Sequence, residues 1–193
     1  MLAPAFLTRP AAGSGAFPPV WATHDDAELA RVVDAVARLG GSTVRCWSTE
    51  DWEGRRDPWK GRPDRWEGPW GAYTIDLTIH LSPNDCAVLK LLRSTEKPVS
   101  ELGTPETYAW STFVLAHESV HVAGYRSEKQ AQCWGLQRVV TTAAHLGRSR
   151  SEGRYLARLA WTRWYPRSRD DYRSSQCHDG GRLDLNPKSH VWP

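Results

Sequence analysis

The chain has little net charge and no long apolar run. Its 193 residues include 25 Lys and Arg against 22 Asp and Glu, a formal net charge of +3. That excess is too small to indicate binding to a nucleic-acid backbone. No apolar stretch reaches the roughly 20 residues that cross a bilayer, so we expect no membrane span. The first residues are rich in Pro, Ala and Gly and lack a basic stretch followed by an apolar one. We therefore expect no signal peptide in this chain, although a leader already removed would leave the same picture.

The remaining composition is that of a globular protein. Hydrophobic residues make up 40% and charged residues 24% of a chain long enough to bury a sizeable core. We expect one domain over residues 24–193, preceded by a Pro-rich arm over 1–23 and ending in an irregular tail over 166–193. Arginines are frequent from Arg148 onward, which indicates a solvated helix face rather than a site for an acidic partner.

Periodicity predicts an α+β fold. The expected order is a helix over 24–39, a strand over 42–47, a strand over 71–81, a helix over 83–92, and three further helices over 104–122, 127–146 and 151–164. We expect a small antiparallel or mixed sheet packed on the helices over 104–122 and 127–146. The segment 71–81 alternates as one strand, with Ile75, Leu77 and Ile79 on one face and Thr74, Thr78 and His80 on the other.

One short segment indicates a chemistry. His117-Glu118-Ser119-Val120-His121 is an HExxH box, and on a helix its histidines lie one turn apart on the same face. Thr104 followed by Pro105 is a helix-start signal. The residues after it are apolar nearly all round, which predicts a buried helix. Buried histidines and a glutamate need partners, and a metal ion with its water would satisfy them together.

Glu128 is the expected third ligand. Ser127 and Gln130 have the spacing of a capping box, which starts a second helix soon after Gly124 stops the first. The short connection predicts antiparallel neighbours, so Glu128 lies near the His121 end of the first helix. Ala131 follows with a small side chain that permits close helix approach. Two histidines, a carboxylate and an open position form the ligand set of a catalytic zinc site.

With its downstream Glu128-Lys129-Gln130-Ala131, this box resembles the zincin metallopeptidases, and specifically the small gluzincins of the ImmA/IrrE type. The resemblance implies that His117, His121 and Glu128 bind Zn²⁺ and that Glu118 is the general base. The box also begins the metzincin pattern, in which Ser127 would stand at the third-ligand position. Serine is a poor zinc ligand, so Glu128 is favoured.

The resemblance implies a zinc metalloendopeptidase that cleaves a peptide or protein substrate. The strand over 71–82 would then offer its edge to an extended peptide. His80 on that strand is a candidate substrate contact. Tyr172 and His178 in the tail are candidates for holding the oxyanion of the transition state. Two alternatives stay open: a zinc-stabilised interaction module without turnover, and a zinc amidase acting on cell-wall peptide.

A Trp-rich loop is expected over residues 48–70. Its tryptophans are Trp52, Trp59, Trp66 and Trp70. A loop of this length is usually functional or disordered, and Trp side chains favour a packed loop. It is a candidate for binding peptide or glycan, although packing against its own domain is the favoured interpretation.

The four cysteines include no CxxC spacing, so a structural zinc knot is not expected. Cys46 lies on a predicted strand and Cys86 just after another, while Cys133 lies on the Glu128 helix and Cys177 in the tail. We predict disulfides Cys46–Cys86 and Cys133–Cys177, which would favour an exported or cell-surface protein. Four free thiols in a cytoplasmic protein are the alternative.

Overall fold

A computed structural model describes residues 20–54 and 72–193, and it has the expected α+β architecture. Its strands are β1 (His24–Asp25), β2 (Thr43–Cys46), β3 (Ala72–Ile75) and β4 (Thr78–Leu81). Its α-helices are α1 (Ala27–Ala37), α2 (Thr49–Gly54), α3 (Pro83–Ser94), α4 (Pro105–Val122), α5 (Glu128–His145) and α6 (Arg150–Leu159). The chain continues from α6 through a π-helical turn (Ala160–Trp164) and a 3-10 turn (Tyr165–Arg167) into an irregular tail.

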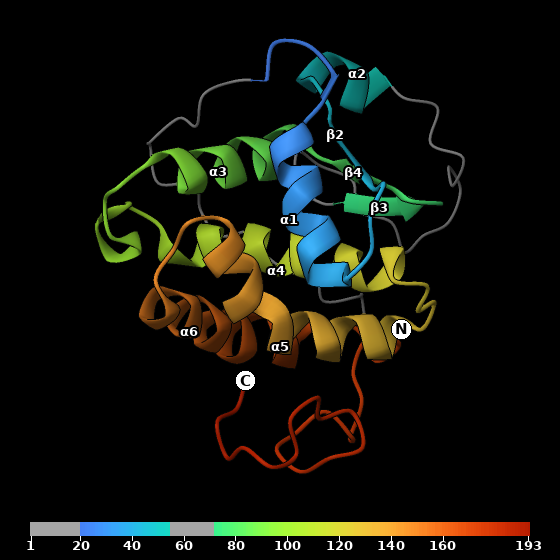
Figure 1. The fold of residues 1–193 in the computed structure, drawn as a ribbon, viewed down its shortest axis with the longest axis vertical. Helices are drawn as coiled ribbons and strands as arrows, with labels where there is room; N and C mark the ends of the chain where they lie inside the picture. The colour runs from blue at the N-terminus through green and yellow to red at the C-terminus, as the bar shows by residue number, and fades with distance from the viewer. Residues whose placement is uncertain (1–19, 55–71) are drawn as a thin grey trace, which may run out of the picture.

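Helix α4 lies at the centre of the molecule. Figure 1 shows it behind α1, with α3 on one side and α5 and α6 on the other. Its sequence is apolar nearly all round, and almost every one of its side chains is buried. The helix starts at Pro105 and stops before Gly124, which adopts φ +91°. The local start and stop signals therefore predicted both ends correctly.

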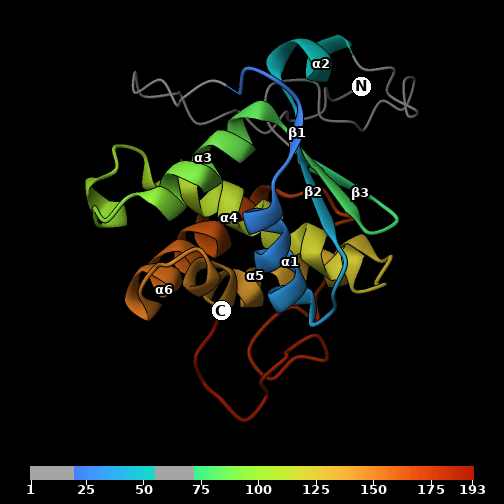
Figure 2. The ribbon, with the colours of Figure 1, turned by 45° about the horizontal axis from the view of Figure 1, so that its top comes forward.

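The sheet is small and mixed, with strand order β1-β2-β4-β3. Strand β2 pairs antiparallel with β1 and parallel with β4, and β3 pairs antiparallel with β4. The strands lie along one flank of the helices (Figure 2), and α4 packs against β3 and β4. Strand β3 is thus an edge of the sheet formed by the described residues.

The prediction of one strand over 71–81 was wrong, because this segment is a hairpin. Asp76 and Leu77 form the turn, and Asp76 adopts the left-handed φ of 54° that Asp tolerates better than most residues. The turn reverses which residues share a face, so Thr74 pairs with the buried Ile79. Ile75 and Leu77 are instead 41% and 45% exposed. Asp-Leu is not a typical hairpin dipeptide. The alternation of apolar and polar residues over 71–81 therefore carried no sequence signal for a turn.

Part of the expected Trp-rich loop is helical. Residues Thr49–Gly54 form α2, and Trp52 on this helix is buried with its ring 6.4 Å from that of Trp47. The segment 55–70, with Trp59, Trp66 and Trp70, lies outside the described residues, as do residues 1–19 of the arm expected over 1–23.

Both predicted disulfides are present. Cys46 on β2 pairs with Cys86 on α3, and Cys133 on α5 pairs with Cys177 in the tail, each with Cα atoms 5.6 Å apart. The first joins the sheet to α3. The second holds the tail, which loops below α5 in Figure 1, against that helix. Two disulfides fit a protein of an oxidising compartment.

Candidate metal centre

Three side chains from α4 and α5 converge on one point. The Nε2 atoms of His117 and His121 are 3.1 Å apart on the same face of α4. Oε2 of Glu128, the first residue of α5, lies 3.2 Å from the His117 Nε2 and 3.4 Å from the His121 Nε2. The structure thus brings together the three residues that the sequence predicted as ligands, while Ser127 caps α5 by accepting a hydrogen bond from the Gln130 amide.

The spacing of these donor atoms fits a zinc ion. Ligand atoms placed tetrahedrally at the usual 2.0–2.1 Å from zinc are roughly 3.3 Å from one another. The three observed separations are close to this value. Two imidazole nitrogens and one carboxylate oxygen are also the donor types that zinc takes in catalytic sites.

The charges around the site favour a cation. Burial lowers the pKa of His121, but the hydrogen bond to Glu128 and the charges of Glu118 and Glu128 raise it, with a net result of about 9. Burial raises the pKa of Glu128, whereas its hydrogen bonds to His117 and His121 lower it to about 2. A positive charge at this point, carried by a proton or by a metal ion, is therefore stabilised.

The two histidines are oriented differently. His121 Nδ1 lies 2.7 Å from the carbonyl oxygen of Tyr125, an acceptor that makes Nδ1 the protonated nitrogen and leaves Nε2 free to bind a metal. The chain turns back at Gly124 to place that carbonyl. The Nδ1 of His117 is buried and has no hydrogen-bond partner within residues 20–54 and 72–193.

Close packing of α4 on α5 brings Glu128 to the histidines. A Cβ placed on Gly135 would lie 2.9 Å from the His117 Cα and 3.0 Å from its backbone nitrogen. The helices can therefore approach this closely only with glycine at position 135. Ala131, which the sequence indicated as the small residue, is fully buried on the same helix. Sequence reasoning missed Gly135, although a glycine at i+7 from Glu128 was a visible signal.

Glu118 lies beside the cluster and meets the edge strand. It is buried to 7% exposure, and its Oε2 accepts a 2.6 Å hydrogen bond from the Thr74 hydroxyl on β3. Thr74 was not recognised from the sequence. Under the single-strand interpretation it shared the solvated face with His80, whereas the hairpin turns it toward α4.

The other candidate residues fall in different places. His80 lies on the opposite face of β4 from Ile79 and accepts a hydrogen bond from the Trp47 indole at 3.1 Å, so it is not part of the cluster. His178 is exposed, with its Nδ1 2.8 Å from the carbonyl of Asp179. Tyr172 does reach the site, where its ring stacks on His117 with centroids 6.0 Å apart. Its role in a transition state stays a prediction.

The hydroxyl of Tyr172 remains protonated in this setting. Burial, and then the charges of Glu128 and Glu118, raise the pKa of Tyr172 above its ordinary value. A neutral phenol can donate a hydrogen bond but does not compete with the carboxylate for a cation.

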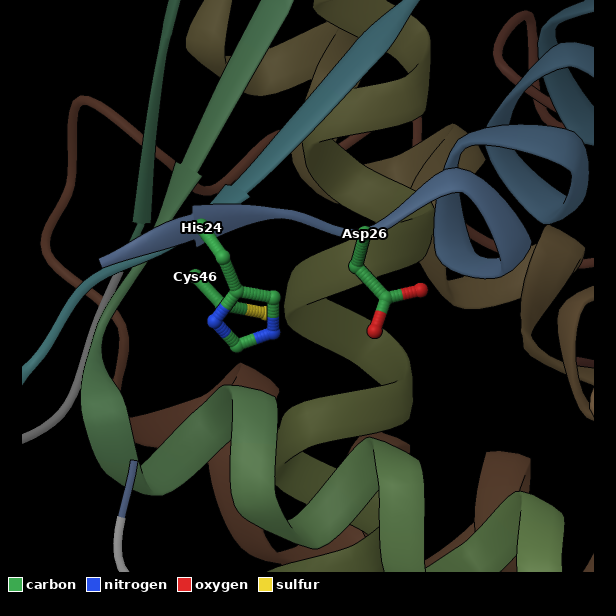
Figure 3. A group of neighbouring side chains, drawn as sticks. All are labelled: His24, Asp26 and Cys46. Atoms are coloured by element: carbon green, nitrogen blue, oxygen red, sulfur yellow. The ribbon is translucent and has the colours of Figure 1, made fainter. Parts of the chain in front are cut away.

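A second group, His24, Asp26 and Cys46, has metal-ligand residue types close together (Figure 3). Cys46 is in a disulfide and offers no thiolate. The Asp26 carboxylate caps α1 by accepting from the Glu28 and Leu29 amides. Lys90 places its ammonium 3.3 Å from the His24 Nε2 and 3.6 Å from the Asp26 carboxylate. A cation is therefore already present, and the donors serve structure.

No family model, curated protein or solved structure matches this chain. None of the helices in the described part of the chain has the length and apolar character needed to cross a membrane.

Proposed function

We propose that this protein is a zinc-dependent metallopeptidase. The observation that carries the proposal is the meeting of His117, His121 and Glu128 at zinc-ligand spacing, with the Glu118 carboxylate next to them. His117 is buried and His121 is partly exposed, and without a proton or a metal ion between them their ring nitrogens and the Glu128 oxygen would direct lone pairs at one another. The donor set therefore supports a resident metal.

His117, His121 and Glu128 would hold the ion. When bound, zinc supplies Lewis acidity, which makes water nucleophilic near neutral pH and polarises a carbonyl group. Glu118 takes the proton of the attacking water on its carboxylate and delivers it to the leaving amine. Thr74 orients this carboxylate through the hydrogen bond to its Oε2. Glu118 is only 7% exposed, so its burial keeps bulk water from competing for the proton.

The edge of the sheet supports an extended peptide as substrate. Strand β3 ends the sheet order in the described residues, and it carries Thr74 into contact with Glu118. A peptide that adds to this edge would pass beside the base. The two disulfides support an exported location for such an enzyme.

The test uses the purified protein loaded with zinc and a mixed peptide library as substrate. Glu118→Gln keeps the side-chain shape but cannot accept a proton. We expect zinc content equal to wild type and hydrolysis lowered by roughly 10²–10⁴-fold. Hydrolysis at the wild-type rate in Glu118→Gln would contradict the mechanism. Equal zinc with no hydrolysis in either protein would favour the non-catalytic zinc module.

The ligand set is tested beside it by metal analysis. Glu128→Ala should lose most of its zinc affinity, whereas Ser127→Ala should keep it and lose only about 1 kcal/mol of stability from the weakened helix cap. Tight stoichiometric zinc in Glu128→Ala would remove Glu128 as a ligand and reopen the metzincin-like alternative.

A further inference from the structure

Residues 168–177 of the tail form a strap that is fastened at both ends to α5. At one end the Gln132 amide donates a 2.7 Å hydrogen bond to the Ser168 hydroxyl. At the other end Cys177 is in a disulfide with Cys133, the next residue of α5. The two ends of the strap are therefore attached to successive residues of α5, Gln132 and Cys133. Tyr172 lies at the middle of the strap.

Ion pairs within the strap and hydrogen bonds to Tyr165 stabilise its conformation. The Tyr165 hydroxyl donates to the Ser174 carbonyl oxygen and accepts from the Ser174 amide, both at 3.0 Å. Arg169 pairs with Asp171 at 3.0 Å, and Arg173 pairs with Asp170. These contacts hold the residues on either side of Tyr172.

The strap delivers Tyr172 to one face of the His117 ring. The Tyr172 ring stacks on it at an interplanar angle of 23°, and the Phe113 ring meets it edge-on, with centroids 5.9 Å apart and an angle of 74°. Two aromatic rings, one stacked and one edge-on, thus contact the His117 ring. Such contacts favour particular ring orientations beyond the effect of the area they bury.

The aromatic contacts orient the His117 ring, which within residues 20–54 and 72–193 has no hydrogen bond at its second nitrogen to do so. Metal-binding histidines are generally oriented by a hydrogen bond from the second ring nitrogen, as in the contact of His121 with the Tyr125 carbonyl. For His117 that nitrogen has no partner in the described part of the chain. Besides the ligand partners His121 and Glu128, the rings of Phe113 and Tyr172 are the contacts among the described residues that can set the direction of its Nε2.

We propose that Tyr172 is a positioning residue, which the Cys133–Cys177 disulfide holds against His117 so that the His117 Nε2 points at the metal. The inference rests on the proposed function for the identity of the metal. It differs from a transition-state role because it requires the ring of Tyr172 and not the hydroxyl.

Two substitutions separate ring from hydroxyl. Tyr172→Ala should lower zinc affinity roughly 10–100-fold, the usual effect of losing an outer-shell partner, measured by competition with a chromophoric chelator. Tyr172→Phe should restore affinity to near wild type. Equal loss in Tyr172→Phe, or no loss in Tyr172→Ala, overturns the proposal.

A second readout needs no metal. In metal-free protein with ¹³C-labelled histidine, the ring currents of Phe113 and Tyr172 shift the Cε1–H resonance of His117. It should move strongly in Tyr172→Ala and little in Tyr172→Phe, and an unmoved resonance in Tyr172→Ala overturns the proposal. Wild-type protein that binds no zinc would overturn the proposed function, while this resonance still decides whether the Tyr172 ring stacks on His117.

The disulfides supply a matched pair of variants. Cys133→Ala with Cys177→Ala should weaken zinc affinity in the same direction as Tyr172→Ala and speed hydrogen exchange across 168–177. Cys46→Ala with Cys86→Ala removes a cross-link of similar sequence separation, 40 residues against 44, and should leave zinc affinity unchanged. Equal zinc affinity in both double variants would overturn the role of the strap.

Discussion

At the scale of single residues, the candidate base depends on a neighbour from another element. Glu118 is buried on α4, and the Thr74 hydroxyl reaches it from β3. A hydrogen bond to a charged group contributes on the order of 1.5–3 kcal/mol, so it can fix the direction of the carboxylate. If the proposed function holds, Thr74 influences turnover without touching the three candidate metal ligands.

Thr74→Val removes this hydroxyl while keeping the side-chain shape. We expect hydrolysis to fall roughly tenfold, less than in Glu118→Gln, because the base remains but is no longer held. Zinc content should not change. Thr78→Val is the control, since Thr78 pairs with Ile75 on the other face of the hairpin. Thr74→Val that cleaves at the wild-type rate would show that the hydrogen bond plays no part.

At the scale of elements, the candidate metal centre depends on the distance between α4 and α5. The histidines come from one helix and Glu128 from the other, so the separation of the helices sets the separation of the donor atoms. Gly135 permits the close approach at His117. Gly153 on α6 plays the same part against Val140 of α5, where a Cβ would lie 3.1 Å from the Val140 Cα.

These glycines allow a paired test. Gly135→Ala and Gly153→Ala should each lower the free energy of unfolding by about 1–3 kcal/mol through overpacking, partly offset by the helix propensity of alanine. Zinc affinity should fall in Gly135→Ala alone, because only that change separates Glu128 from the histidines. Calorimetry of unfolding and zinc titration check the two expectations. Unchanged zinc affinity in Gly135→Ala would contradict this account of helix spacing.

At the scale of the whole molecule, a buried arginine joins segments that are distant in the sequence. Arg148 follows α5 and donates to the carbonyl oxygens of Leu92, Thr95 and Lys97 at the end of α3. Its guanidinium also pairs with Glu152 of α6 at 2.5 Å. The same carboxylate accepts from the Val99 amide, so one ion pair holds three parts of the chain together.

This ion pair predicts a dependence of stability on acid. Burial raises the pKa of Glu152, but hydrogen bonds from Arg148, Ser149 and Val99 lower it to about 2 from 4.5. Because the folded-state pKa is the lower one, the stabilisation is complete above about pH 4.5 and is lost as the pH falls through about 2. Glu152→Gln should lower the free energy of unfolding on the order of 1–2 kcal/mol at neutral pH, after allowance for solvent screening, and flatten this dependence. Urea titrations between pH 2 and 7 measure it, and parallel curves for the two proteins would refute the assignment.

The sequence by itself determined the features that neighbouring residues control. Pro105 and Gly124 set the ends of α4, and the spacing of His117 and His121 places both on one face of it. These signals act within one or two helical turns, so they do not depend on the rest of the fold. The cysteine pairing was also predictable, because Cys46 lies on one predicted strand, Cys86 follows another strand expected to be adjacent, and Cys177 in the tail was left with Cys133.

Only the tertiary structure decided the contacts between elements. The hairpin turn at Asp76 placed Thr74 on the same face as the buried Ile79, while His80 stayed on the opposite face, and no local residue preference predicted that turn. The path of the strap selected Tyr172 rather than His178 to meet His117, although both lie near Cys177 in the sequence. The packing of α4 on α5 made Gly135 necessary. Such contacts depend on the positions of segments tens of residues apart, which the burial of the common core sets and local preference does not.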